Sequence, residues 1–441
     1  YSDFDEARLV ADRISLVKMK THDSFEEFAI LYRTNAQSRV LEESLRKRNI
    51  PYRIYGGLSF YQRKEVKDAL AYFRLAVNPA DDEALRRIIN FPSRGIGETT
   101  LNKLLRTATD AKVSIWDVIC DLETYNPGVN SGTARKLGDF RSLIANFVNM
   151  NAEGVDANEL ARRIIADTHL LSMLMSDRTP ENLSKQENLN ELLSGVNEFV
   201  STRIEEGNEH ISLSDFMGEV SLATDQDLKD ADDGERERVT LMTAHAAKGL
   251  EFNNIFIVGV EEDLFPSAMA NGSLQEIEEE RRLLYVAITR ARNFCMMSYA
   301  RSRYRNGQTS TCSPSRFIRD IDPALLRLHA GASIGNSQRS FDNFIDSYHS
   351  SPGPRKDLTA GRDPSRWIPK EEKPRTPAKS MSGTHSPSEL TEGMEIEHER
   401  FGRGVITAID TSRQDARITV RFSDTDMRTL LLKFARFNIL N

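Results

Sequence analysis

Five short apolar runs within the first 330 residues have the pattern of β-strands. They lie at residues 28–33, 51–55, 239–243, 254–260 and 294–299. Strands of a parallel sheet that is covered on both faces are largely apolar, and the run at 28–33 (FAILYR) is such an apolar run that ends in a polar residue. The pattern therefore predicts a buried parallel sheet whose strands come from two distant parts of the chain.

Apolar positions at three- and four-residue spacing predict helices between these runs. Short helices are expected at 36–48, 59–73 and 277–292, and the pattern is helical throughout from about 80 to 235. Strands and helices that alternate on both sides of a long helical stretch are typical of an α/β domain with a helical insertion. We therefore predict an α/β domain built from residues 1–120 and 235–330. Residues 121–234 are predicted to form an inserted all-α domain, and the start of this insertion is the least certain limit.

The last 111 residues have a different composition. Residues 331–392 hold seven of the 15 prolines, among serine, glycine and basic residues, which is typical of a disordered linker. Residues 393–441 contain short strand-like runs separated by polar turns. Five or so short strands are enough to close a small antiparallel barrel, and we predict one here.

The composition is that of a soluble globular protein, with 28% charged and 39% hydrophobic residues. No run approaches the ~18 apolar residues of a membrane span, and no signal peptide opens the sequence. The three cysteines do not form a disulfide framework or a Cys-x-x-Cys metal motif, so we expect no bound metal and a cytoplasmic location. Because Tyr1 rather than Met opens the sequence, we expect the chain to be part of a longer protein.

The net charge of −7 hides a strong local asymmetry. Residues 33–74 carry ten basic and four acidic side chains, whereas residues 203–237 carry three basic and twelve acidic ones. Each run could be an ordinary solvated surface. The mean charge nevertheless gives no argument against nucleic acid, because binding depends on the local field.

The first candidate site follows the first predicted strand, where Tyr32 and Arg33 lead into a helix. Ligands of open parallel sheets bind beyond the carboxyl ends of the strands. An aromatic ring and an arginine at such a position could stack on a base and reach a phosphate. The alternative is an ordinary surface arginine.

The second candidate site is the segment 243–252 (TAHAAKGLEF), which also follows a predicted strand. Its small residues and Gly249 allow a ligand to approach the backbone closely. The segment is not a P-loop, and the G-x-x-x-x-G-K-[ST] pattern occurs nowhere in the sequence. For His245 a purely structural role is the alternative.

The third candidate site is the helical segment 278–292 (EEERRLLYVAITRAR). Arg282, Val286 and Arg290 share one helix face through their three- and four-residue spacing. Arg290 could act as an arginine finger on a transferring phosphoryl group. An exposed helix with Glu–Arg pairs is the alternative.

Taken in order, these segments resemble motifs IV, V and VI of superfamily-1 DNA helicases, and most closely those of the UvrD/PcrA/Rep group. The run YRIYGGLSFYQRKEVKDALAYFRL and the C-terminal GMEIEHERFGRGVITAID also resemble this group. The resemblance implies a RecA-like domain (called 2A), an inserted helical domain (2B) and a C-terminal Tudor-like β-barrel.

The resemblance also implies roles for individual residues. Tyr32 would stack on the adenine of ATP, and Glu251 would hold its ribose. Arg33 and Arg290 would be the catalytic arginines that contact the γ-phosphate.

Single-stranded DNA would be contacted by Thr243 and His245. The segment that holds Gly56, Gly57 and Arg63 would support the same DNA track. The basic run at 33–74 agrees with this role, because neutralising phosphates dominates affinity for nucleic acid.

The family's phosphate-binding first RecA-like domain, which carries the Walker A and B motifs, has no counterpart in the sequence. We therefore expect the C-terminal motor portion of an ATP-dependent 3′-to-5′ DNA helicase of repair or replication. ATP with Mg²⁺ would be bound mainly by the missing domain, so the chain alone would be inactive. Expected partners are single-stranded and duplex DNA and, through the β-barrel, RNA polymerase, but no membrane. Two alternatives remain, namely the motor of a helicase–nuclease subunit and a non-catalytic interaction module.

Overall fold

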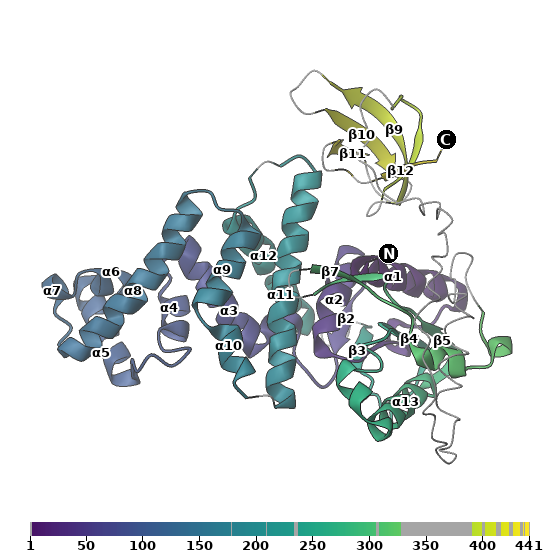
Figure 1. Ribbon diagram of the computed structural model, residues 1–441, viewed down its shortest axis with the longest axis horizontal. Coiled ribbons are helices and arrows are strands. Elements are labelled where there is room, and N and C mark those ends of the chain that lie inside the picture. The colour runs from purple at the N-terminus through teal and green to yellow at the C-terminus, as the bar shows by residue number, and fades with distance from the viewer. Residues whose placement is uncertain are drawn as a thin grey trace, which may run out of the picture.

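The computed structural model divides into an α/β part, an elongated helical block and a small β module (Figure 1). It describes residues 2–177, 179–208, 210–232, 237–305, 308–327, 390–398, 402–411, 416–422, 427–432, 435 and 437–440. The predicted linker at 331–392 falls almost wholly outside these residues.

The α/β part is built on a sheet of five parallel strands in the order β2-β3-β1-β4-β5. The strands are β1 (Phe28–Tyr32), β2 (Tyr52–Ile54), β3 (Val239–Thr243), β4 (Phe252–Ile257) and β5 (Ala291–Met297). The predicted α/β class and its parallel sheet are confirmed. Strand β3, from the second half of the domain, lies between β1 and β2 of the first half, so the sheet forms only when both halves meet.

Helices cover both faces of this sheet, and the alternation of side chains along β1 shows how. Phe28, Ile30 and Tyr32 point to one face, where they pack with residues of α1 (Asp3–Thr21) and α2 (Ser38–Lys47). Ala29 and Leu31 point to the other face, which packs against α13 (Leu274–Ile288). All five residues of β1 are buried, which explains why its sequence is apolar throughout.

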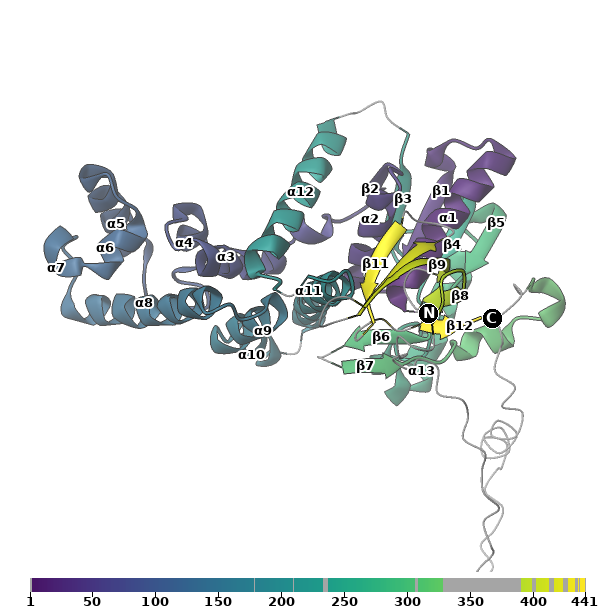
Figure 2. The same ribbon diagram turned by 90° about the horizontal axis from the view of Figure 1, so that it is seen from above.

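Within the described residues between β2 and β3, ten α-helices form the helical block, which extends away from the sheet in Figures 1 and 2. They are α3 (Lys64–Val77), α4 (Asp82–Ile88), α5 (Glu98–Ala111), α6 (Ile115–Cys120), α7 (Leu122–Tyr125), α8 (Ser131–Ala152), α9 (Ala157–Asp167), α10 (Leu170–Met175), α11 (Pro180–Glu205) and α12 (Leu213–Asp232). One apolar cluster runs through the block from Phe60 to Ala223. The predicted limit at residue 121 therefore falls inside this cluster and separates helices that share a core.

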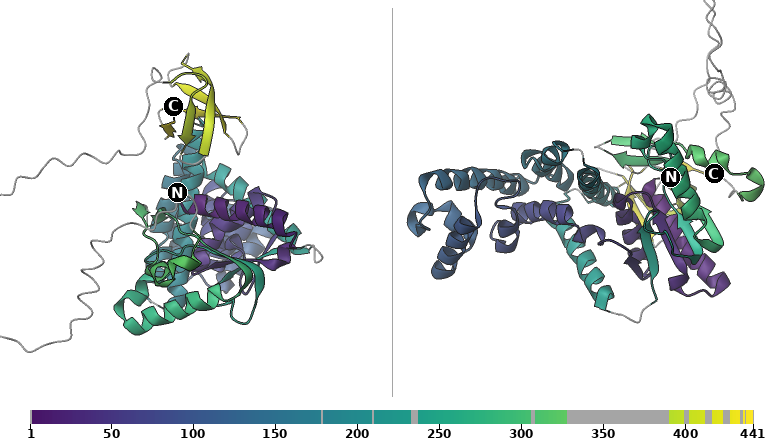
Figure 3. Two further views of the ribbon diagram at one scale, coloured as in Figure 1. Left: turned by 90° about the vertical axis from the view of Figure 1, so that its right-hand side faces the viewer. Right: turned by 90° about the horizontal axis from the view of Figure 1, so that it is seen from below.

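The β module holds five antiparallel strands in the order β11-β10-β9-β8-β12. They are β8 (Glu395–His398), β9 (Gly402–Asp410), β10 (Arg417–Phe422), β11 (Met427–Leu431) and β12 (Phe437–Ile439). The module lies at the end of α11, where Arg428 pairs with Glu206 (Figure 3, left). A Cβ atom added to Gly207 would lie 3.8 Å from Leu431, so the two parts approach each other closely there.

Among the described residues, no helix is both long enough and apolar enough to cross a membrane. The hairpin of β6 (Ser302–Arg305) and β7 (Gln308–Thr311) completes the α/β part and packs against α11.

Candidate functional site

The predicted site residues gather at one edge of the parallel sheet, because the carboxyl ends of parallel strands lie side by side. Tyr32 at the end of β1 is paired in register with Thr243 at the end of β3. Strand β2 ends beside β3 and leads into Gly56 and Gly57. The segments that follow these three strands therefore form one surface.

Two segments predicted to contact DNA are neighbours on this surface. Gly56 has φ +73°, a left-handed conformation that favours glycine, and a Cβ atom added to it would lie 3.9 Å from the Cβ of Ala246. Thr243 shapes the second segment, since its Oγ1 accepts a hydrogen bond of 3.2 Å from the N–H of Ala246. Gly56, Gly57 and His245 are exposed.

His245 lies within the electrostatic reach of the first candidate site. Partial burial of the imidazole and the positive charge of Arg33 lower the pKa of His245 below its ordinary value, against the opposing effect of Glu280. The neutral form of the ring is therefore favoured. The N–H of Ala244, next to His245, donates to the carbonyl of Tyr32 at 2.8 Å, so the segment of His245 lies beside the one that begins at Arg33.

Arg33 makes a bidentate ion pair with Glu280 of α13. The Nε of Arg33 donates to both carboxylate oxygens at 3.1 and 2.9 Å, and its Nη2 donates to Oε1 at 2.5 Å. The carboxylate is buried, and its Oε2 also accepts a hydrogen bond from the backbone N–H of Ser267 at 3.3 Å. In this arrangement the charge of Arg33 is already neutralised.

The sequence reasoning missed the residues that hold Arg33. Glu280 is 247 positions away from Arg33 in the sequence. The only signal for Glu280 in the sequence was that it belongs to the acidic run 278–280. Gln37 was also missed, although its Oε1 accepts hydrogen bonds from the N–H groups of Arg33 and Thr34 at 2.9 and 3.0 Å. Both residues fix the turn that follows β1.

Tyr32 is placed in the core rather than at the surface. Only 1% of the residue is exposed, and burial is the main reason why the pKa of Tyr32 is raised. Its ring belongs to the apolar cluster beneath α1 and α2. The predicted stacking on adenine remains a prediction, and it would require the ring to leave this position.

Arg63 is likewise turned inward. Its guanidinium donates to the carbonyl of Asn35 at 2.9 Å, to Oδ1 of Asn188 at 2.8 Å and to Oγ of Ser38 at 2.7 Å. With 8% exposure it connects the start of α2 to α11. Its predicted contact with DNA also remains untested, and it would break these bonds.

Arg290 and Glu251 lie where α13, β4 and β5 meet. Arg290 donates from Nε to the carbonyl of Val286 at 3.1 Å and from Nη1 to the carbonyl of Leu250 at 3.3 Å. Glu251 pairs with Arg292 at 3.4 Å, and both side chains are about half exposed. The segment that begins with Thr243 thus contacts Arg290 near its end, through the carbonyl of Leu250, and Glu251 follows directly.

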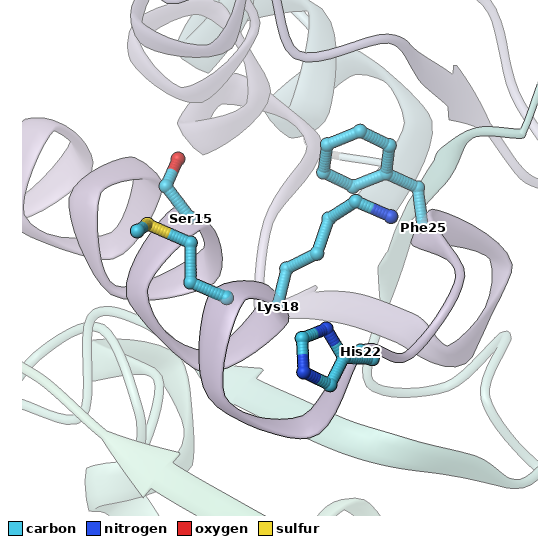
Figure 4. A pocket seen from close by; sticks show the side chains of 5 residues that line it. Ser15, Lys18, His22 and Phe25 are labelled. Atoms are coloured by element: carbon cyan, nitrogen blue, oxygen red, sulfur yellow. The ribbon is translucent and has the colours of Figure 1, made fainter.

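A separate hollow of about 560 Å³ lies near the C-terminal end of α1 (Figure 4). It is lined by Ser15, Lys18, Met19, His22 and Phe25. Phe25 precedes β1, so the hollow is at the amino edge of the sheet, opposite the candidate site. Lys18 is engaged there with the ring of Phe25, 4.2 Å from its centroid. No predicted site residue lines this hollow.

The family profile described as "UvrD-like helicase C-terminal domain" matches residues 1–302, which include all the predicted site residues. The chain belongs to this family. The resemblance to UvrD/PcrA helicases is thus confirmed, and the parallel five-stranded sheet fits the RecA-like domain expected of a UvrD-like helicase.

Curated relatives extend the match of this UvrD-like chain over nearly its full length. "ATP-dependent DNA helicase PcrA" of Leuconostoc citreum is 34% identical over 445 residues, which cover 98% of this chain and 56% of the relative. The protein of the same name from Staphylococcus epidermidis is 33% identical over 434 residues, covering 98% and 54%. That of Bacillus subtilis is 39% identical over 328 residues, covering 74% and 43%. The chain spans about half the length of the curated relatives it matches.

Proposed function

We propose that this chain is the second motor domain, with its helical block and β module, of an ATP-dependent DNA helicase. The observation that carries the proposal is the segment 243–251. Its first residues, Thr243 and His245, share an exposed surface with Gly56. Its last residues lie against Arg290, 3.3 Å from the Leu250 carbonyl. DNA and nucleotide would therefore be bound at the two ends of one short segment.

The nucleotide side of the proposal rests on Arg290 and Glu251. Arg290 would stabilise the charge on the γ-phosphate during its transfer to water, and Glu251 would hold the ribose. Since the sequence contains no phosphate-cradling Walker A pattern, ATP would bind between this domain and a second domain that supplies one. Among the described residues no group of three or more His, Cys, Asp or Glu could hold a metal ion, so we assign Mg²⁺ to no residue here.

The DNA side rests on Thr243, His245, Gly56 and Gly57. Their surface faces solvent, and the basic run 33–74 borders it. Arg63 and Tyr32 do not enter the proposal in their present positions, since both are buried. Arg33 belongs to the nucleotide side as a predicted contact of the γ-phosphate, and Glu280 holds its guanidinium.

Movement would arise from the cleft between the two motor domains. ATP binding would close the cleft on Arg290 and hydrolysis would open it, so that DNA advances along both domains in the 3′-to-5′ direction. The helical block would swivel to regulate unwinding. Repair or replication is the proposed setting, and we propose the β module as the surface that contacts RNA polymerase.

The test uses the full-length protein that contains this chain. Its ATP hydrolysis should rise strongly on addition of single-stranded DNA, and it should unwind duplexes with a 3′ single-stranded tail in preference to those with a 5′ tail. Preference for a 5′ tail would overturn the proposed direction. Absence of DNA-stimulated ATP hydrolysis in well-folded protein would overturn the proposal as a whole.

A further inference from the structure

Helix α13 is attached to the sheet edge at two points, and the second point has no assigned role. Arg290, two residues beyond the last residue of the helix, donates to the Leu250 carbonyl at 3.3 Å. Glu280, eight residues and about 12 Å before the end of the helix, holds Arg33 in the bidentate pair. Arg33 directly follows β1, and the carbonyl of Tyr32, the last residue of β1, accepts a hydrogen bond of 2.8 Å from the N–H of Ala244, next to His245.

These contacts form a closed chain between the DNA surface and the nucleotide side. The N–H of Ala244, next to His245, donates to the carbonyl of Tyr32 at 2.8 Å. Arg33 follows Tyr32 and is bonded to Glu280. Helix α13 leads from Glu280 toward Arg290, which is bonded to the carbonyl of Leu250. A buried bidentate Arg–carboxylate pair fixes both distance and orientation. A shift of the segment 243–250 on binding DNA would therefore move Glu280 and, with it, helix α13.

We propose that Glu280 is a positioning residue that keeps helix α13, and with it Arg290, in register with the DNA-contact segment. The inference rests on the proposed function. Glu280 itself touches neither nucleotide nor DNA. It acts through Arg33, and its removal should uncouple DNA binding from hydrolysis.

The same helix offers a matched control. Glu279 is the neighbouring glutamate, 73% exposed, and it pairs with Arg282 of its own helix at 3.2 Å. Glu280 is 10% exposed and pairs across the fold. Changing either residue to glutamine removes one carboxylate charge from α13, but only Glu280→Gln removes the bidentate ion pair with Arg33.

The experiment measures DNA-stimulated ATP hydrolysis in the full-length protein. Glu280→Gln should lower the kcat at saturating DNA about tenfold or more, while the Kd for a single-stranded oligonucleotide stays within about twofold. Glu279→Gln should change neither quantity. A loss of stability alone would weaken DNA binding as well as lower the kcat.

A second variant covers the case in which Glu280→Gln folds poorly because Arg33 is left unpaired. The double variant Arg33→Gln with Glu280→Gln removes both charges and leaves no buried charge without a partner. It should fold and lose DNA stimulation no more than Arg33→Gln alone does, because Glu280 acts only through Arg33.

The outcomes separate the two proposals. If the unmodified protein shows no DNA-stimulated hydrolysis, the proposed function fails. If the unmodified protein is stimulated and Glu280→Gln is stimulated equally, the positioning role fails. The positioning role also fails if the losses of kcat in Arg33→Gln and Glu280→Gln add up in the double variant.

Discussion

Arg290 differs from Arg33 in the groups that hold its guanidinium. Within the described part of the chain, its hydrogen bonds go to two backbone carbonyls and the hydroxyl of Thr289, which are neutral acceptors. Arg33 is bonded to the carboxylate of Glu280. Arg290 thus keeps its net charge available for a phosphate, as an arginine finger requires.

We predict that Arg290→Ala in the full-length protein lowers DNA-stimulated ATP hydrolysis about a thousandfold or more, because the transition-state charge loses its cation. Binding to single-stranded DNA should be nearly unchanged. The measurements are the kcat for ATP and the Kd for a labelled oligonucleotide. Turnover close to that of the unmodified protein would refute the assigned role.

The lowered pKa of His245 gives a second prediction at the residue scale. Because partial burial and Arg33 disfavour the imidazolium, the folded state binds fewer protons than the unfolded state below about pH 6.5. Any stability that the neutral ring contributes is present above that pH and is lost as the pH falls through the folded-state pKa. NMR titration of the ring should give a midpoint below 6.5.

A control variant isolates the effect of the neighbouring charge. Arg33→Gln removes a positive charge and leaves Glu280 to favour the imidazolium, so the midpoint of His245 should rise. A midpoint that does not move would show that His245 and Arg33 are not electrostatically coupled.

At the scale of elements, α11 is attached to the α/β part by a cluster of charges. Arg39 of α2 is 3% exposed and is bonded to Glu43 of its own helix at 3.0 Å. It also contacts Glu191 at 2.7 Å and Glu198 at 3.3 Å, both on α11. Gly195 lies between the latter two, and a Cβ atom added there would come within 3.1 Å of the guanidinium. The absence of a side chain at Gly195 allows this close approach.

Three carboxylates surround the single guanidinium of Arg39 in this cluster. Removing the arginine should therefore cost more stability than removing one of the carboxylates. Arg39→Ala would leave buried carboxylates without compensation and should lower the free energy of unfolding by about 3–5 kcal/mol. Urea denaturation at pH 8, with exchange of backbone amides in α2 and α11 as a local probe, measures this loss. Unchanged stability would show that α11 is held by other contacts.

Glu191→Gln is the matched comparison. Burial raises the pKa of Glu191 to about 7, against the opposing effect of Arg39. Between its ordinary pKa of 4.5 and about 7 the folded state binds more protons than the unfolded state, so its contribution to stability falls as the pH rises through this range. As the pH rises from 5 to 8, the free energy of unfolding of Glu191→Gln should therefore increase relative to that of the original chain. A relative loss over that range would contradict the raised pKa.

For the molecule as a whole, α11 connects all three parts. Its middle is bonded to the α/β part through Asn188 and Glu191, and its core residues belong to the helical block. Just beyond its last turn, Glu206 pairs with Arg428 of the β module. In Figure 1, α11 lies between the helical block and the α/β part, and one of its ends approaches the β module. Any rotation of the helical block would therefore disturb its contacts with both neighbours.

We also predict that the 441-residue chain alone shows no DNA-stimulated ATP hydrolysis, because Arg290 has no phosphate-cradling loop to act with. The measurement compares phosphate release by the purified chain and by the full-length protein, each with and without oligonucleotide. Circular dichroism of the chain serves as the control for folding. Turnover by the clean chain would reveal a nucleotide site that the sequence motifs do not mark.

Much of this architecture can be predicted from local patterns. Largely apolar runs identify β1 and β4 as buried strands, because a strand covered on both faces has few polar positions. The same rule places the segments after β1 and β3 at one edge, since parallel strands end together. Thr243, His245 and Gly56 were expected there, and the structure brings them together.

The direction and partner of each side chain were decided by tertiary packing. Tyr32 points to the same face of the sheet as Phe28 and Ile30. Only the packing of α1 and α2 shows that these helices still cover this face at Tyr32, the last residue of β1. Arg33 acquires its partner 247 residues away, a distance across which no local pattern reaches. Sequence periodicity determines where a strand ends, but long-range contacts determine whether a charged or aromatic residue at that end remains free for a ligand.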